Sequence, residues 1–302
     1  MTFPALHRSD LLQAVMDKSN SWCVRYFAAV SLSQSKAEEI VDPLISVVLD
    51  RNAPPLVRAG AAIGLQTVVL RNQRVKDALT SVLYEPNVPS IVTAKVMVCL
   101  GQVGVDDLDL MLKIANSPVR SLNGLGTNFN AIRAIATSKN PKALDLLFAL
   151  LDKYPPNSLL RGVVIDEWTA IADSNPRRFA PWRERLAEKL IPVSRQEIFG
   201  AGNLNSVIKL MGKTHSPIVV DRLIELMEDP SQDPVIVAFS AQALGIIGDR
   251  RALPHVKKLW NNLPNDTRGG NEFGRLLSAY KRGDKSDQNV WDIKEALDRL
   301  SK

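Results

Sequence analysis

Cysteine and histidine, which build most disulfide frameworks and metal sites, are scarce in this sequence. The chain of 302 residues has two cysteines and three histidines. Cys23 and Cys99 lie inside apolar helical patterns, which is typical of small buried side chains. His7, His215 and His255 fall at an end, in a predicted turn and on a predicted outer helix, and no nucleophile or metal ligand can be placed beside them. This scarcity argues against a disulfide scaffold, a metal site and an ordinary hydrolase.

Long apolar runs and a strong charge of one sign are also missing. No run approaches the roughly 18 residues that span a bilayer, and residues 1–15 lack the features of a signal peptide. We therefore expect a cytoplasmic protein with no membrane span. The net charge of +6 is spread evenly over the two halves. The densest basic cluster, within residues 177–189, alternates with Glu184 and Glu188, as on a solvated helix face, so nucleic-acid binding is not favoured.

What the chain does have is an internal repeat. The segment AIATSKNPKALDLLFALL at residues 134–151 has the same pattern as ALGIIGDRRALPHVKKLW at residues 243–260. Related segments place one apolar residue in phase at steps of 33 to 40 residues, and we call these the reference residues: Leu32, Leu65, Leu100, Ile135, Ile171, Met211, Leu244 and Leu277. A period in this range, filled by two helical patterns, predicts a helical solenoid.

Each repeat reads as an outer helix, a short turn and an inner helix. In the second repeat, residues 36–50 have apolar side chains at helical spacing, and Pro55 begins the inner helix, where its missing N–H costs nothing. Ala61 and Ala62 narrow the buried stripe of that helix, which lets neighbouring helices approach closely. The sequence predicts one all-α domain over residues 1–302, an α-α superhelix of about eight helix pairs with a capping helix at 288–302.

Two strings carry a family resemblance. SWCVRYFAAVSL and ALGIIGDRRALPHVKKLW resemble HEAT repeats of the phycobilisome-lyase type, in which an inner helix V-R-x-x-A-A-x-x-L is followed by G-D-x-R-A-L-P. The resemblance implies that the arginine after the valine, here Arg25 and Arg58, forms an inter-repeat ladder with acidic residues. The equivalent positions in the other repeats hold different residues: Thr93, Asn128, Val164, Leu204, Val237 and Gly270.

The same resemblance implies two functional classes. One is the scaffold, adaptor or chaperone that binds a protein partner in its concave face and has no chemistry. The other is the bilin lyase or chromophore chaperone, which would hold a linear tetrapyrrole while a cysteine of a phycobiliprotein attacks it. We take the first as the main hypothesis, with another protein as partner and no cofactor, and keep the second, with its bilin, as the alternative.

The repeat pattern is broken in the fifth repeat. Two positions that are alanine elsewhere become Glu167 and Trp168, preceded by Asp166 and Arg161. A carboxylate at a small interior position is costly unless it is paired, so this group is a candidate binding site. The alternative is a local rotation of the helix, with Trp168 in the buried stripe and Glu167 at the groove edge.

A second break affects the inner segments of the even-numbered repeats, at residues 121–130, 197–206 and 267–275, which are rich in glycine and asparagine. Glycine inside a helix costs about 1 kcal/mol relative to alanine. These segments either form an irregular loop before a shortened helix or admit a ligand close to the backbone. Candidate binding residues here are Asn128, Asn130, Arg195, Gly200 and Asn203, and we expect the partner to bind across repeats four to six.

Overall fold

The computed structural model describes residues 7–118, 122–195, 200–262 and 296–301, and all regular structure within these ranges is helical. The predicted all-α repeat fold is therefore confirmed. The chain divides into two compact units, Met1–Ala149 and Leu150–Lys302, with the boundary inside helix α9 (Ala143–Lys153). Within the described ranges no helix is both long and apolar enough to cross a membrane.

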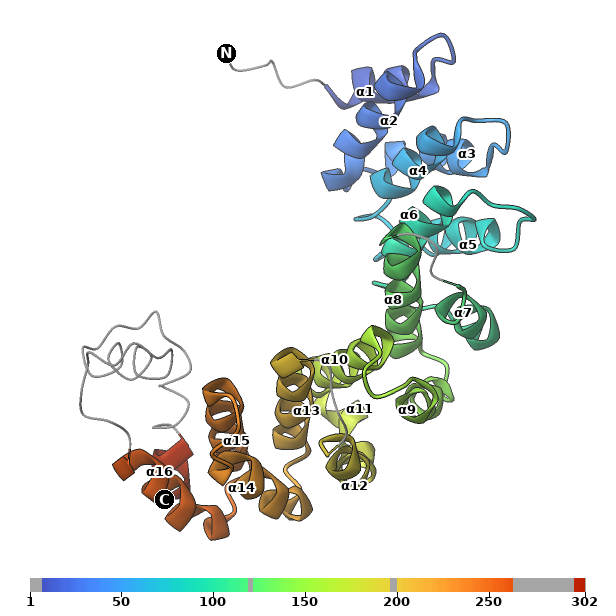
Figure 1. Ribbon diagram of the computed structural model, residues 1–302. Helices are drawn as coiled ribbons and strands as arrows, with labels where there is room; N and C mark the ends of the chain where they lie inside the picture. Colours follow the sequence, from blue (N-terminus) through green and yellow to red (C-terminus); the bar gives the residue numbers. More distant parts are fainter. Residues whose placement is uncertain (1–6, 119–121, 196–199, 263–295, 302) are drawn as a thin grey trace. The chain divides into compact units, whose positions relative to one another are not determined.

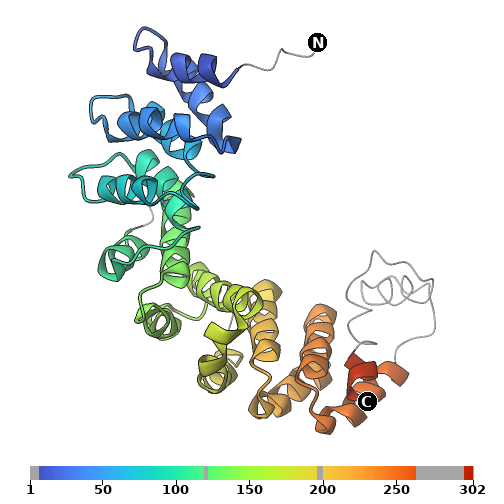
Figure 2. The ribbon, with the colours of Figure 1, turned by 180° about the vertical axis from the view of Figure 1, so that it is seen from behind.

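The first unit consists of helix pairs in two layers. Its first helices and second helices alternate along the chain: α1 (Arg8–Met16), α2 (Trp22–Ser31), α3 (Val41–Leu49), α4 (Pro55–Gly64), α5 (Gln73–Val82), α6 (Ser90–Leu100), α7 (Leu108–Ala115) and α8 (Leu122–Thr137). The second helices α2, α4, α6 and α8 pack one on the next, and the first helices α1, α3, α5 and α7 cover one side of them (Figure 1). The view from behind shows the same two layers (Figure 2).

The second unit repeats this arrangement. Its helices are α10 (Leu159–Ser174), α11 (Pro176–Phe179), α12 (Arg183–Val193), α13 (Gly200–Thr214), α14 (Val220–Glu228), α15 (Pro234–Ile247) and α16 (Leu253–Asn262). The second helices α10, α13 and α15 pack in series, and α12, α14 and α16 belong to the first-helix layer. Short 3-10 turns precede or follow several helices: Leu32–Gln34, Glu38–Ile40, Ala180–Trp182, Pro217–Val219 and Arg250–Ala252.

Burial follows the predicted repeat phase. Seven of the eight reference residues, Leu32 through Leu244, are at most 7% exposed, and the eighth, Leu277, lies outside the described residues. Small residues set the distance between neighbouring second helices. A Cβ atom on Gly60 would lie 2.9 Å from the Tyr26 ring, and one on Gly64 would lie 2.7 Å from the carbonyl oxygen of Ala29. The close packing of α2 on α4 therefore depends on glycine.

In the first two repeats, the arginine after the valine ties the second helix to the end of the first helix. Arg25 Nε donates to the carbonyl oxygen of Val15, and Arg58 Nε donates to that of Val48, both at 2.8 Å. Arg58 also forms an ion pair with Glu85 of the next repeat at 2.9 Å, where both side chains are less than 9% exposed. This pair is the inter-repeat contact that the resemblance implies, and it belongs to the folded core.

Two of the glycine-rich segments are helical over their described residues. Of the two alternatives for them, the irregular loop before a shortened inner helix does not hold there, because α8 is helical from Leu122 and α13 from Gly200. In α8 the cost of glycine is outweighed by tertiary packing, since Ala131, Ile132 and Ile135 are fully buried. The third segment, 267–275, lies outside the described residues.

Residues 296–300 are helical and pack against α15. Ala296 and Leu300 are each 2% exposed. Gly245 lies so close to Ala296 that a Cβ atom on this glycine would overlap the backbone of Ala296. The remainder of the predicted capping helix, 288–295 and 302, lies outside the described residues.

Candidate functional site

The repeat register identifies a row of side chains, two positions from each described reference residue, that are not part of the buried core. The residues two positions before the reference residues are apolar and half-buried in the first three repeats (Val30, Ile63 and Val98), whereas the fourth repeat holds the exposed Arg133. In the second unit the same register holds Thr169, Lys209 and Gln242. Two positions after the reference residues, the second unit holds Asp173, Lys213 and Ile246 on α10, α13 and α15, where the first unit holds uncharged polar residues: Gln34, Thr67, Gln102 and Thr137. The position two residues before the reference residue is therefore polar from the fourth repeat to the seventh.

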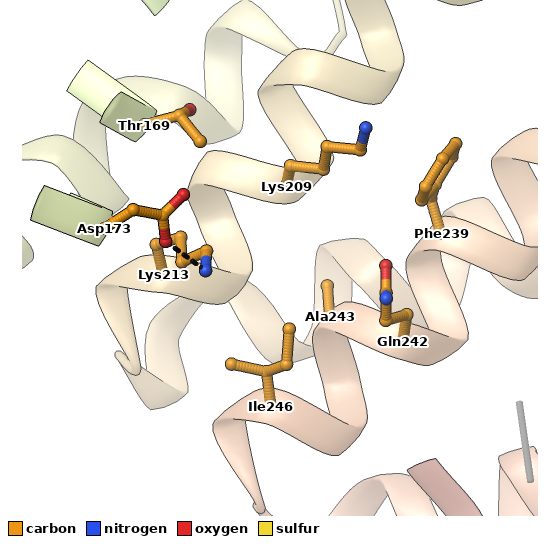
Figure 3. Close-up of a pocket in the computed structure, with 8 residues that line it drawn as sticks. All are labelled: Thr169, Asp173, Lys209, Lys213, Phe239, Gln242, Ala243 and Ile246. Atoms are coloured by element: carbon orange, nitrogen blue, oxygen red, sulfur yellow. Dashed lines mark ion pairs between the residues drawn. The ribbon is translucent and has the colours of Figure 1, made fainter. Parts of the chain in front are cut away.

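The six residues at these positions in the second unit line a groove of about 330 Å³ across its second helices. Its walls come from three helices: Thr169 and Asp173 on α10, Lys209 and Lys213 on α13, and Phe239, Gln242, Ala243 and Ile246 on α15 (Figure 3). A Cβ atom on Gly212 would lie 3.1 Å from the Cα and Cβ of Ala243, so α13 and α15 approach closely below the groove. The groove is thus built on a packed helix contact.

The groove contains two ammonium groups in different environments. Lys213 Nζ lies 2.5 Å from Asp173 Oδ1, and both side chains are partly exposed. Lys209 Nζ lies 4.5 Å from the centre of the Phe239 ring, in a cation–π contact. Thr169 donates its hydroxyl to the carbonyl oxygen of Ile165 at 3.0 Å, so its oxygen is left as an acceptor. With one carboxylate and two ammonium groups, this lining carries a net charge of +1.

The sequence-predicted group on α10 lies mostly in the core of the second unit. Trp168 is fully buried, and its ring contacts Trp182 at 5.2 Å and Phe179 at 6.3 Å between centroids. Arg161 and Glu167 are 5% and 6% exposed. Burial lowers the pKa of Arg161, and the charge of Asp152 opposes this effect.

The alternative for this segment, a rotated helix with Trp168 in the buried stripe, agrees with these positions, since Val164 and Ile171 are buried beside it. Glu167 differs from that alternative, because it is buried and does not lie at a groove edge. Asp166 alone of the predicted group is exposed. Within the described residues, Trp168 Nε1 is buried and has no hydrogen-bond acceptor.

The asparagines predicted on α8 make hydrogen bonds within the first unit. Asn128 is 2% exposed, and its Nδ2 donates to the carbonyl oxygens of Ala115 at 2.8 Å and Ser117 at 2.9 Å. It holds the repeat position of Arg58 and, like that arginine, ties its helix to the end of the preceding first helix. Asn130 is half-buried and donates to the carbonyl oxygen of Gly126 at 2.8 Å.

The other predicted residues lie in the second unit. Gly200 and Asn203 are in the first turn of α13. Arg195 is exposed just beyond the end of α12, and its Nη2 lies 3.5 Å from Glu225 Oε2 on α14, in the first-helix layer. Sequence reasoning missed Lys209, Lys213, Phe239 and Gln242. The signal for two of them was present in the register, because Lys209 and Lys213 flank the reference residue Met211 by two positions on either side.

Within the described residues, no group of three or more His, Cys, Asp or Glu side chains is arranged to hold a metal ion. No protein-family model and no curated protein matches the sequence. Among solved structures, an engineered protein from a structural genomics consortium is 15% identical with a TM-score of 0.52, covering 97% of this chain and 78% of that one. Human deoxyhypusine hydroxylase in complex with glycerol is 14% identical, covering 97% and 96%, with a TM-score of 0.33. At these identities the engineered protein supports the fold alone.

Proposed function

We propose that this chain is a non-catalytic helical-repeat protein of the cytoplasm that binds a protein partner on the second helices of its second unit. The observation that carries the proposal is the groove, where three successive helices present repeat-equivalent polar side chains around Phe239. Helical arrays bind partners along such rows, because each repeat adds one helix to a continuous surface.

The groove suits a protein segment for two physical reasons. It lies across three helices of the row, and it combines an aromatic ring and aliphatic walls with a few charged and amide groups. This composition matches the cores of protein interfaces, where aromatic anchors carry much of the binding free energy and polar groups set the orientation. We include the HEAT-like family relationship in this proposal, since the Arg58–Glu85 contact is of the kind that such repeats use.

Affinity capture from the source cell tests the proposal. Wild type is compared with the double variant Phe239→Ala/Gln242→Ala, which removes the ring and amide but keeps all charges of the groove. Lys258→Gln on α16 is the control, because Lys258 is 68% exposed in the first-helix layer, away from the second-helix row. We expect a partner that wild type and Lys258→Gln retain and that the double variant loses. Retention of every captured protein by a folded double variant would contradict the proposal.

The bilin-lyase alternative makes a separate prediction with the same samples. A lyase or chromophore chaperone binds an open-chain tetrapyrrole with a change in visible absorbance, and it captures a phycobiliprotein. A scaffold produces no absorbance change. Titration of the purified chain with a linear tetrapyrrole therefore distinguishes the two functions without knowledge of the partner.

A further inference from the structure

We infer that the groove recognises a carboxylate carried by an acidic segment of the partner protein. The inference rests on the proposed function and adds the chemistry of the ligand. Lys209 and Lys213 are four residues apart on α13, so both side chains project from the same face of this helix. Both line the one groove between α10 and α15 (Figure 3).

Lys209 supplies the ammonium group that is available to bind a ligand. Its side chain is exposed, and among the described residues no carboxylate lies within ion-pair distance of it. The Phe239 ring orients the charge through a contact at 4.5 Å but accepts none of its three N–H donors as a carboxylate would. An oxygen ligand beside the ring therefore gains hydrogen bonds that the ring does not supply.

Lys213 is held by Asp173, and this pair makes the groove selective. Asp173 balances one of the two lysine charges, which leaves room for one negative charge from a ligand. A ligand carboxylate that contacts Lys209 competes with Asp173 for Lys213. A polyphosphate chain carries more negative charge than a lining of net charge +1 can balance, so repulsion from Asp173 disfavours it more than a single carboxylate.

The remaining walls fit the rest of an acidic side chain. Gln242 offers amide N–H donors, while Ala243 and Ile246 form an apolar surface against which the methylene groups of a glutamate or a neighbouring leucine can pack. A segment with glutamate and leucine one helical turn apart presents both kinds of group to the groove. The structure thus favours an acidic, amphipathic protein segment over a nucleic acid.

The test uses a labelled helical peptide of Glu-Ala-Ala-Leu repeats and a matched peptide in which glutamine replaces glutamate. Fluorescence anisotropy of both peptides is measured with the full chain, together with a single-stranded DNA of similar length. We expect wild type to bind the glutamate peptide more tightly than the glutamine peptide, with an affinity that falls as salt increases. Equal affinity for the two peptides, or tighter binding of the DNA, would overturn the inference.

Three variants show where the peptide binds. Two of them are expected to change its affinity in opposite directions. We expect Lys209→Gln to weaken the glutamate peptide about three- to fivefold, the effect of one partly exposed ion pair. Asp173→Asn removes the competing carboxylate and should tighten binding, which damage to the fold would not do. Lys258→Gln, with the same charge change in the first-helix layer, should have no effect. Weaker binding by Asp173→Asn, or no effect of Lys209→Gln, contradicts the assignment.

The two proposals fail in different ways. If a partner depends on Phe239 and Gln242 but the peptides show no preference for glutamate, the groove binds a protein and the carboxylate assignment is wrong. If the glutamate peptide binds through Lys209 but no cellular partner depends on the groove, the ligand chemistry stands and the partner-binding role is wrong.

Discussion

The burial of Trp168 gives the sharpest test of how the second unit is held together. The indole is fully buried between α10 and the segment before α12, with Trp182 and Phe179 as ring neighbours. Trp168→Ala removes the whole ring system from a packed core. Truncations of this kind cost about 3–5 kcal/mol in free energy of unfolding, a large share of the roughly 5–15 kcal/mol that stabilises a folded domain.

A second substitution separates the packing of the ring from its polar atom. Within the described residues Trp168 Nε1 has no acceptor, and a buried unsatisfied donor costs about 1–3 kcal/mol. Trp168→Phe removes this donor while it keeps one aromatic ring against Trp182. We therefore expect Trp168→Phe to destabilise the protein much less than Trp168→Ala does.

Urea unfolding followed by circular dichroism measures both changes, and hydrogen exchange shows where they act. Because a repeat contacts only its neighbours, protection should fall mainly in α10 and α12 and persist in α2 and α4. Groove binding is measured on the same samples. A melting temperature of Trp168→Ala equal to that of wild type would refute the packing argument. Normal stability with lost partner binding would instead support a binding role for this residue.

Three further predictions concern the described core. Among the described residues, Arg58→Met leaves the Glu85 carboxylate with only the exposed Arg51, at 3.5 Å, as an ion-pair partner, and should cost about 3 kcal/mol of stability in urea unfolding, whereas a cost below about 1 kcal/mol would mean that the pair is solvated. Gly245→Leu has no space beside Ala296, so limited proteolysis should remove the C-terminal helix from this variant sooner than from wild type. Burial raises the pKa of the Cys99 thiol from 9.0 to about 12, so its stabilising effect is complete below pH 9 and is lost as the pH rises towards 12. Native Cys99 should therefore resist iodoacetamide at pH 8, and rapid alkylation before unfolding would contradict its burial.

The helical repeat could be predicted from the sequence because burial recurs with the same period as the residues. Leu65, Leu100 and Leu244 are fully buried at the positions that the pattern assigns to them. Each repeat packs on its neighbours through the same positions, so side chains at those positions must be apolar or small. The sequence pattern and the buried core therefore reflect the same packing requirement.

The local deviations could not be predicted, because tertiary contacts decided them. Glycine lowers helix propensity in the first turns of α8, but packing of Ile132 and Ile135 stabilises the helix through them. Glu167 and Trp168 occupy positions that hold alanine elsewhere, and the sequence did not reveal that Phe179 and Trp182 would enclose the indole. Both outcomes depend on contacts with residues of other helices.

The groove was not predicted from the sequence for a different reason, and that reason also supports its role in binding. The reference residues are apolar in both units because folding requires it. If packing alone selected the residues two positions before them, the same side-chain types would recur there too. Instead Val30, Ile63 and Val98 of the first three repeats contrast with the polar residues of the next four repeats: Arg133, Thr169, Lys209 and Gln242. A partly exposed position in a packed array is free to vary, so a change of chemistry shared by successive repeats is better explained by what those repeats bind than by how they fold.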